Sequence, residues 1–270
     1  MNFIDMLKYI FLGFIQGLTE PIPVSSSGHL VIFKSLLNDN VLNDLNFEII
    51  VNFGSLIAIL LIFRKDLIDI IHDFFLYIKT KEEKYYNNFK YAWLIVIGSV
   101  PAGIAGLLLK DKIESVLGGV KIVGFALLVT ALFLFLVKDY KGKKNDDSIS
   151  VSNALVIGFF QVLALFPGIS RSGATLVGGM QQGLKREAAF KYSFMLYIPI
   201  SFATMGLGIM DLIESNINMA TLFYYVLGAI TSCIVTYFST KWFKDIVKKG
   251  KLIYFVWYCL IVGTLVILFV

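Results

Sequence analysis

The feature that most constrains this chain is a succession of apolar stretches, each about as long as a bilayer core is thick. Because an α-helix rises about 1.5 Å per residue, about 20 apolar residues cross roughly 30 Å of hydrocarbon. Six such stretches lie at residues 47–63, 91–109, 120–137, 192–210, 219–240 and 252–270. The mean hydropathy of +0.78 and the 57% share of apolar residues exclude an ordinary water-facing surface. The sequence therefore predicts an all-α polytopic membrane protein.

Two further apolar regions, 3–37 and 151–184, are each interrupted by proline. Pro21 and Pro23 interrupt the first region and Pro167 the second, and a cluster of serine and glycine follows each break. Proline ends a helix because it lacks the amide hydrogen and its ring clashes with the preceding turn. Irregular backbone at membrane depth is tolerated only inside protein or beside a water-filled cavity. We therefore expect two re-entrant helical hairpins whose polar tips form the wall of a site.

The two interrupted regions also resemble each other. Residues 13–30, GFIQGLTEPIPVSSSGHL, and residues 158–175, GFFQVLALFPGISRSGAT, are identical at seven of 18 positions when shifted by 145. Each half of the chain then consists of one hairpin and three spans. Since three is odd, the second half must begin on the opposite face of the membrane, which predicts two inverted repeats. The single membrane domain, 1–270, divides into halves 1–137 and 151–270, joined by a cytoplasmic linker at 138–150.

The distribution of lysine and arginine predicts the orientation. Eighteen of the 24 lie in four segments expected on the cytoplasmic side, 64–90, 138–147, 185–191 and 241–251. Five lie on the opposite side, namely Lys8, Lys34, Lys110, Lys112 and Lys121. Cytoplasmic loops carry such an excess, so both termini are expected to be extracytoplasmic. The net charge of +5 belongs to these loops, and nucleic-acid binding is not predicted.

The polar tips carry residues suited to binding an anion. In each tip Ser-x-Ser-Gly precedes an apolar stretch, which is typical of a capped helix N-terminus. If the halves are inverted, the two N-termini point toward each other and their N–H groups converge on an anion. Arg171 lies between Ser170 and Ser172, and its planar guanidinium suits phosphate. The tips therefore predict a phosphate-binding site.

The first tip adds groups that could act on a bound phosphate. A carboxylate at membrane depth, Glu20, is costly unless it is functional, and it could serve as a base or a metal ligand. His29 could transfer a proton or attack phosphorus. Together with Arg171 and the serines, these groups suit phosphoryl transfer to water. The residues alone do not exclude a carrier that holds the same anion, and they disfavour a structural scaffold.

At these motifs the chain resembles the undecaprenyl-diphosphate phosphatase family, also called bacitracin-resistance proteins. The matching segments are GLTEPIPVSSSGHL (17–30), FEIIVNFGSLIAIL (47–60), PAGIAGLL (101–108), PGISRSGAT (167–175) and REAAFKYSFMLYIP (186–199). The resemblance implies an enzyme of the bacterial plasma membrane that hydrolyses undecaprenyl diphosphate to undecaprenyl phosphate and inorganic phosphate. This reaction recycles the lipid carrier of cell-wall synthesis and confers bacitracin resistance. The resemblance also implies a divalent cation, Mg²⁺ or Ca²⁺, and an active site that opens extracytoplasmically.

Residue by residue, the resemblance implies catalytic roles for Glu20, Ser26, His29 and Arg171. It leaves the nucleophile open between Ser26, His29 and water. The other hydroxyl and glycine residues of the tips are expected to bind substrate: Ser25, Ser27, Gly28, Ser170, Ser172, Gly173 and Thr175. Gln16 stands where the family often has glutamate, so the second carboxylate of a two-carboxylate metal site is missing here. The expected metal ligands are Glu20 and the carbonyl oxygen of Gln16. The partners are then undecaprenyl diphosphate and membrane lipid, with a homo-oligomer left open. The alternative is a polyprenyl-phosphate or small-anion transporter with an inverted-repeat fold.

Overall fold

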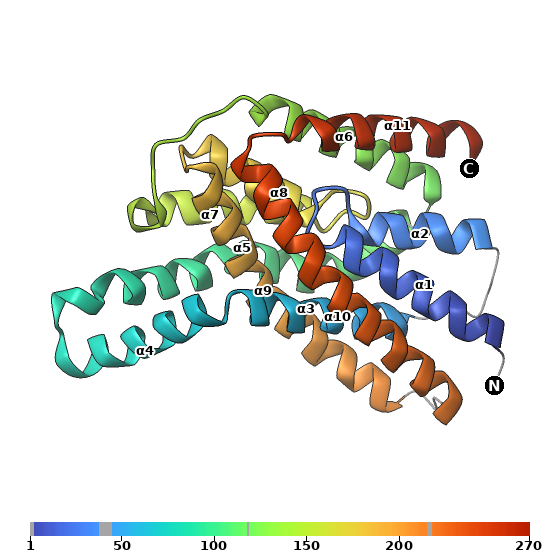
Figure 1. Ribbon diagram of the computed structural model, residues 1–270, viewed down its shortest axis with the longest axis horizontal. Helices are drawn as coiled ribbons and strands as arrows, with labels where there is room; N and C mark the ends of the chain where they lie inside the picture. Colours follow the sequence, from blue (N-terminus) through green and yellow to red (C-terminus); the bar gives the residue numbers. More distant parts are fainter. Residues whose placement is uncertain (1–2, 38–44, 118, 215–217) are drawn as a thin grey trace.

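The computed structural model describes residues 3–37, 45–117, 119–214 and 218–270, and its regular structure within these ranges is helical (Figure 1). The side chains at 37, 45, 110–117 and 209–214 lie outside the described part, among them Lys110 and Lys112 of the charge count. The α-helices are α1 (Phe3–Thr19), α2 (Ser26–Leu37), α3 (Leu45–Ile62), α4 (Arg64–Thr80), α5 (Tyr86–Leu117), α6 (Val120–Val137), α7 (Val151–Leu163), α8 (Arg171–Gln181), α9 (Arg186–Glu214), α10 (Met219–Lys248) and α11 (Ile253–Phe269). Short 3₁₀ turns, η2 (Glu83–Tyr85) and η3 (Asp146–Ser148), precede α5 and α7.

All six predicted spans are helices, which confirms the class of polytopic helical membrane protein. Within the described residues, three helical segments are long and apolar enough to cross a membrane by themselves: Glu83–Leu109, Val120–Val137 and Met219–Lys248. Asn46–Ile62 with Arg64–Thr80 adds a fourth if this pair, bent by 73°, counts as one span. Large apolar side chains such as Phe125, Phe159 and Phe238 are 58–65% exposed. Such exposure is unfavourable in water and favourable in lipid.

The two predicted hairpins are present as α1–α2 and α7–α8. Figure 1 shows α1 and α2 at the end of the molecule where both termini lie, and α7 toward the opposite end. Each hairpin is followed by three long helices: α3, α5 and α6 in the first half, and α9, α10 and α11 in the second. The element order of the two halves is therefore the same apart from α4.

The segment 64–90 differs from the charged loop that the sequence predicted. Residues 64–80 form α4, which η2 connects to α5, and Phe74 stacks on Phe89 of α5 at 5.2 Å between ring centroids. Its charged residues recur at helical spacing and leave apolar residues such as Ile70 to pack inward. The high charge content concealed this periodicity. The side chain of His72 on this helix is 63% exposed.

Small residues allow the long helices to approach closely. A Cβ added to Gly13 of α1 would lie 2.3 Å from the carbonyl oxygen of Gly228 in α10. A Cβ added to Gly158 of α7 would lie 2.4 Å from the carbonyl oxygen of Gly98 in α5. Because lipid provides no hydrophobic drive for helices to associate, such close backbone packing is what holds membrane helices together. The first helix of each hairpin is thus packed against a long helix of the other half.

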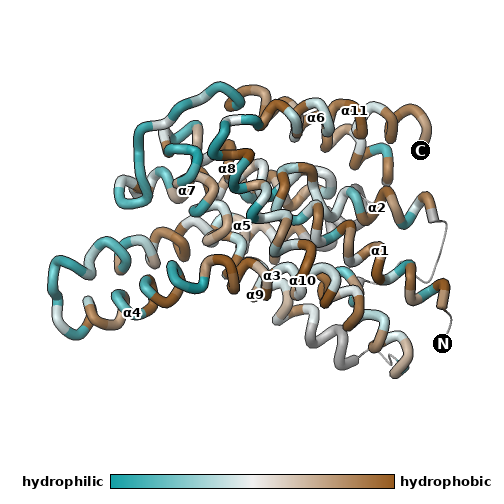
Figure 2. Tube along the Cα trace, viewed as in Figure 1, coloured by the Kyte–Doolittle hydropathy of each residue, from teal (hydrophilic) through white to brown (hydrophobic). Residues whose placement is uncertain are grey.

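Charge is distributed unevenly over the molecule. Figure 2 shows hydrophilic residues concentrated at the end opposite to both termini, over the α4–α5 turn, the linker and the start of α9. The linker is ordered against this end, since the amide of Lys144 donates to Gly183 and the amide of Lys185 donates to Lys144. The four positively charged segments of the sequence therefore gather at one end of the bundle.

Candidate active site

The first hairpin turns between α1 and α2, where Pro21 and Pro23 stop the helix. Ser25 ends the turn with φ of 67°, a left-handed conformation that residues with a Cβ adopt only under constraint. Its Oγ accepts a hydrogen bond from the amide of Gly28 at 3.3 Å and so caps α2. The constrained cap sets the direction of α2 and places Ser26 and Ser27 in its first turn.

The second hairpin repeats this arrangement. Gly168 takes φ of 95° in the turn, which glycine adopts without steric cost. Ser170 caps α8, because its Oγ accepts the amide hydrogen of Gly173 at 3.1 Å. The two caps are equivalent under the sequence shift of 145, since Ser25 and Gly28 match Ser170 and Gly173. Arg171 is consequently the first residue of α8.

The two tips contact each other reciprocally. A Cβ on Gly28 would lie 3.1 Å from Cα of Gly168, and a Cβ on Gly173 would lie 3.1 Å from Cβ of Pro23. Pro23 and Gly168 are also related by the shift of 145. In addition, Ser172 Oγ donates to the carbonyl oxygen of Ile22 at 3.1 Å. This contact brings Arg171 of the second tip beside Glu20 of the first.

Glu20 is the centre of a polar cluster between the tips. Its Oε1 accepts a hydrogen bond from Arg171 Nη2 at 2.6 Å. Its Oε2 accepts one from Ser26 Oγ at 2.5 Å and one from Gln16 Nε2 at 3.0 Å. The side chains of Glu20 and Arg171 are 10% and 16% exposed. A buried charge pair stabilises little by itself, so its cost favours a functional role.

One donor of this cluster is unused. Arg171 Nη1 is buried and has no hydrogen-bond partner among the described residues. A buried donor without an acceptor costs free energy, and such a group is often explained by a ligand. The free half of the guanidinium, beside a carboxylate that holds a hydroxyl, can bind an anion while the hydroxyl loses its proton to the carboxylate.

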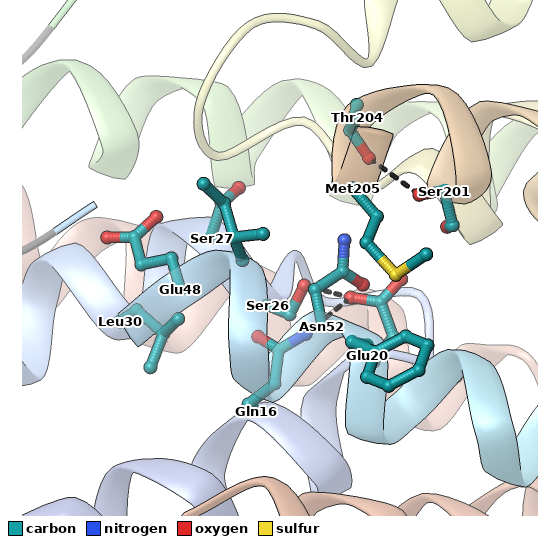
Figure 3. A pocket seen from close by; sticks show the side chains of 12 residues that line it. Gln16, Glu20, Ser26, Ser27, Leu30, Glu48, Asn52, Ser201, Thr204 and Met205 are labelled. Atoms are coloured by element: carbon teal, nitrogen blue, oxygen red, sulfur yellow. Dashed lines mark hydrogen bonds between the residues drawn. The ribbon is translucent and has the colours of Figure 1, made fainter. Parts of the chain in front are cut away.

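A pocket of about 210 Å³ opens beside this cluster (Figure 3). This volume is below the roughly 300–1,000 Å³ of pockets for drug-sized ligands, so it suits a small head group. Four helices form its wall: α1, α2, α3 and α9. The lining residues are Gln16, Glu20, Ser26, Ser27, Leu30, Glu48, Ile49, Asn52, Phe53, Ser201, Thr204 and Met205.

Several polar residues of the wall were not predicted as site residues. Asn52 and Glu48 lie within the apolar stretch 47–63, and their polarity there is the signal that could have drawn attention to them. Glu48 forms an ion pair with Lys34, in which Lys34 Nζ lies 2.5 Å from Glu48 Oε1. The side chain of Lys34 is 8% exposed. Tyr197 of α9 lies under Arg171, with its ring centroid 4.0 Å from the guanidinium carbon. Nothing in the spacing of the sequence indicated this contact.

His29 is close to the cluster in the chain but does not line the pocket. Its ring is 3% exposed, Nδ1 lies 2.8 Å from the carbonyl oxygen of Ser25, and Nε2 lies 2.7 Å from the hydroxyl of Tyr258 in α11. The rings of His29 and Tyr258 stack at 5.6 Å. Both ring nitrogens are thus engaged on the α11 side of α2.

The structure divides the predicted substrate-binding residues into two groups. Ser27 lines the pocket, whereas the other members form the tips and their support. Ser170 and Ser172 are hydrogen-bonded to each other at 3.1 Å, and Thr175 bonds Ser193 at 2.5 Å. The expected residues that do not line the pocket are Ser25, Gly28, Ser170, Ser172, Gly173 and Thr175. Which of these side chains enter the pocket depends on how each helix is rotated about its own axis. The sequence motif does not specify that rotation.

The oxygen atoms of the pocket are compatible with a divalent cation. The described residues contain no group of three His, Cys, Asp or Glu side chains that could enclose a metal ion. Mg²⁺ commonly keeps several waters and takes one or two carboxylates with substrate phosphates, and Ca²⁺ also prefers oxygen ligands. Glu20 offers a carboxylate, and Gln16, whose Nε2 is bonded to Glu20, keeps its Oε1 available (Figure 3). The donor set therefore fits a cation shared with a ligand.

A second cavity, of about 820 Å³, lies at the charged end of the bundle among Asp66, Lys185 and Lys244. Lys191 forms ion pairs there with Asp66 at 2.6 Å and Asp146 at 3.3 Å. Burial raises the pKa of the Asp146 carboxyl, and Lys191 opposes that shift. Its lining includes no serine, threonine, cysteine or histidine to act as a nucleophile beside a carboxylate. The pocket at Glu20 is therefore the candidate active site.

These features define a polytopic helical membrane protein with a buried charged pocket where two helical hairpins meet. Residues 9–265 match the family model described as bacitracin resistance protein BacA. The chain is 47% identical over 269 residues to undecaprenyl-diphosphatase 1 of Bacillus cereus, covering 99% of both chains. It is 44% identical to undecaprenyl-diphosphatase 1 of Bacillus licheniformis over the full length of both, and 39% identical to undecaprenyl-diphosphatase of Oceanobacillus iheyensis, covering 99% and 98%. The chain belongs to the BacA family.

Proposed function

We propose that this chain hydrolyses undecaprenyl diphosphate to undecaprenyl phosphate and inorganic phosphate, and thereby recycles the lipid carrier of cell-wall synthesis and confers bacitracin resistance. The observation that carries this function is the Glu20 carboxylate, which binds the Ser26 hydroxyl and the Arg171 guanidinium together. The relatives named undecaprenyl-diphosphatase, at up to 47% identity over nearly the whole chain, support it. Hydrolysis is favoured over the transporter alternative.

The cluster supports a mechanism in which Arg171 binds the terminal phosphate and Glu20 acts as the base. The free Nη1 of Arg171 and the N-terminus of α2 stabilise the charge of the phosphoryl oxygens. Ser26 Oγ attacks the terminal phosphorus as its proton passes to Glu20, the bond to the bridging oxygen breaks, and undecaprenyl phosphate leaves. Water then attacks the phosphoserine and releases inorganic phosphate. Attack by a water molecule activated by Glu20 is the alternative route.

The contacts of His29 support an indirect role. An imidazole that attacks phosphorus must first free a ring nitrogen, and both are engaged by Ser25 and Tyr258. Held in this way, His29 fixes the strained turn at Ser25 and so the position of Ser26. Of the three candidate nucleophiles, the structure therefore favours Ser26 or water.

A divalent cation, Mg²⁺ or Ca²⁺, belongs to the proposal. Glu20 and the Oε1 of Gln16 would hold it with oxygens of the diphosphate. Bound there, it would neutralise phosphate charge and favour the leaving of the terminal phosphoryl group. Because one carboxylate and one amide bind a cation weakly, the ion is expected to arrive with the substrate.

The proposed relation between the halves is an inverted repeat, 1–137 and 151–270, joined at 138–150. The reciprocal contacts of Gly28 with Gly168 and of Gly173 with Pro23 support it, since a two-fold axis requires each contact to occur twice. The close packing of α1 on α10 and of α7 on α5 supports it as well, because these pairs exchange under the same operation.

The pocket and both termini are proposed to face the extracytoplasmic side of the bacterial plasma membrane. The gathering of the four basic segments at the opposite end supports this orientation. The pocket at Glu20 is too small for a long prenyl chain, so the chain is proposed to lie in lipid or between helices while the head group enters. Membrane lipid would then be the immediate surroundings of the substrate.

The test measures inorganic phosphate released from undecaprenyl diphosphate by the purified chain in detergent, with Mg²⁺, with Ca²⁺ and with chelator. Arg171→Ala and Glu20→Ala should abolish cation-dependent release, whereas Arg64→Ala, at an exposed site on α4, should not. No release from folded wild type would refute the hydrolase. Uptake of labelled polyprenyl phosphate into sealed vesicles would then test the transporter.

A further inference from the structure

Tyr197 holds the guanidinium of Arg171 from one face. The guanidinium carbon lies 4.0 Å from the ring centroid, and the Tyr197 side chain is 3% exposed. Arg171 Nη2 is fixed by Glu20 at 2.6 Å. A cation above a buried aromatic face is attracted by the ring, and the planar guanidinium can stack on it. Ring and carboxylate together leave Nη1 as a buried donor without a partner among the described residues, beside the pocket although Arg171 is not one of the residues that line it.

The hydroxyl of the same tyrosine holds a second residue of the pocket. Tyr197 donates a 2.7 Å hydrogen bond to Oδ1 of Asn52, and its hydroxyl also lies 3.4 Å from the backbone carbonyl oxygen of Asn52. Since Oδ1 accepts this bond, the amide cannot rotate without losing it. Nδ2 has no acceptor in the described part of the chain, and Asn52 lines the pocket. Figure 3 shows Nδ2 directed away from the Glu20 carboxylate.

We propose that Tyr197 is a positioning residue that aims two donors, Arg171 Nη1 and Asn52 Nδ2, at the diphosphate, and that Asn52 is a substrate-binding residue. This inference rests on the proposed function only in naming the anion. The Tyr197 ring supports the guanidinium of Arg171, the charged donor. The Tyr197 hydroxyl sets the orientation of the Asn52 amide, the neutral donor. An amide with the opposite orientation would present Oδ1 to the phosphate and repel it.

Substitutions separate the two parts of Tyr197. Tyr197→Phe keeps the ring beneath Arg171 and releases Asn52, so the KM should rise about 3- to 10-fold, the effect of one hydrogen bond, with kcat changed less than about 2-fold. Tyr197→Leu removes both supports and should lower kcat/KM by about 100-fold or more, as loss of a charged hydrogen bond does. Asn52→Asp replaces the donor by a carboxylate and should raise the KM by about 10-fold or more.

The matched control is Tyr192→Phe on the same helix. Tyr192 is also buried and donates a 2.6 Å hydrogen bond, but its acceptor is the carbonyl oxygen of Leu94, a residue that does not line the pocket. It should lose stability without a change in KM. Binding without turnover is measured as the thermal stabilisation of each purified variant by inorganic pyrophosphate at constant Mg²⁺. Pyrophosphate should bind Tyr197→Phe and Asn52→Asp more weakly than wild type and Tyr192→Phe.

Two results distinguish this inference from the proposed function. If wild type hydrolyses the substrate but Tyr197→Phe and Asn52→Asp keep the wild-type KM and pyrophosphate affinity, Tyr197 and Asn52 have only structural roles. If wild type hydrolyses nothing, yet pyrophosphate stabilises it and Tyr197→Phe weakens that binding, the hydrolase fails and the positioning of the anion donors stands.

Discussion

Ser26 Oγ donates a 2.5 Å hydrogen bond to Glu20 Oε2 across the break of the first hairpin. The two residues are six positions apart, Glu20 directly after α1 and Ser26 at the start of α2, so the bond depends on the turn between the helices. Pro21 and Pro23 force that turn, and Ser25, with φ of 67°, ends it. The strained tip is therefore what brings a hydroxyl and a base together.

Ser26→Ala tests whether this hydroxyl attacks phosphorus. If it does, kcat should fall about 100-fold or more, as expected when a positioned nucleophile is lost. Wild type quenched during turnover should contain phosphoserine at position 26, detectable by mass spectrometry. Ser99→Ala is the control and should keep most of the activity, because Ser99 is a buried serine of α5 whose hydroxyl donates to the carbonyl oxygen of Ile95 and which does not line the pocket. A loss under 10-fold in Ser26→Ala without phosphoserine would identify water as the nucleophile.

Arg171→Lys tests whether the site requires the planar guanidinium of Arg171 or only its positive charge. Lysine keeps the charge, but its single ammonium cannot stack on Tyr197, pair with Glu20 and present a further fixed donor at once. We expect kcat/KM to fall about 100-fold, within the range of a lost charge-assisted hydrogen bond. Arg64→Lys, at the exposed start of α4, is the matched control. Activity of Arg171→Lys near that of wild type would mean that charge alone binds the phosphate.

Tyr258→Phe tests the indirect role of His29. The change removes the 2.7 Å bond to Nε2 and keeps the stacked ring. If His29 only holds the tip, activity should fall less than about 10-fold, the effect of one neutral hydrogen bond. The pH profile of kcat should also be unchanged. A 100-fold loss with a shifted pH profile would show that the histidine and the tyrosine transfer protons. Tyr254→Phe, with its 56% exposed side chain, is the control.

The sequence predicted the elements that depend on local chemistry. Proline breaks, serine caps and apolar length located the hairpins and a helix at each of the six predicted spans. The repeat at a shift of 145 also placed Arg171 and Glu20 in two tips expected to meet. Each of these predictions rests on covalent geometry or on the cost of burying polar backbone, which neighbouring residues reveal.

The remaining features depend on how helices are rotated against one another. His29 is one turn from Ser26, but only the packing of α2 against α11 turns its ring toward Tyr258. Tyr197 and Asn52 lie 145 positions apart, and their bond depends on the crossing of α3 and α9. No spacing within a motif specifies such contacts. The helix α4 was missed for another reason, because its charge content concealed its periodicity.

Gln16→Glu tests the cation site. A second carboxylate four residues before Glu20 lies on the same face of α1 and adds charge to the oxygen donors. Without a cation the two carboxylates repel, so the variant should be less stable than wild type in chelator. With Mg²⁺ it should reach half-maximal activity at a lower Mg²⁺ concentration. Gln16→Leu should raise the Mg²⁺ concentration needed for half-maximal activity. An unchanged Mg²⁺ dependence in both variants would place the cation elsewhere.

Gln161→Leu should stabilise the protein. Gln161 is the counterpart of Gln16, but Leu165 stands where the first repeat has Glu20, so its amide lacks the corresponding acceptor. Its side chain is 2% exposed, and both polar atoms lack hydrogen-bond partners among the described residues. Leucine should remove a penalty of about 1–3 kcal/mol. Each kcal/mol corresponds to about 2–4 °C in Tm, measurable by thermal unfolding in detergent.

Gln16→Leu, which breaks a bond to Glu20, is the control and should not raise the Tm. A lower Tm for Gln161→Leu would mean that the amide is satisfied by bound water, and that the second tip keeps a polar site of its own.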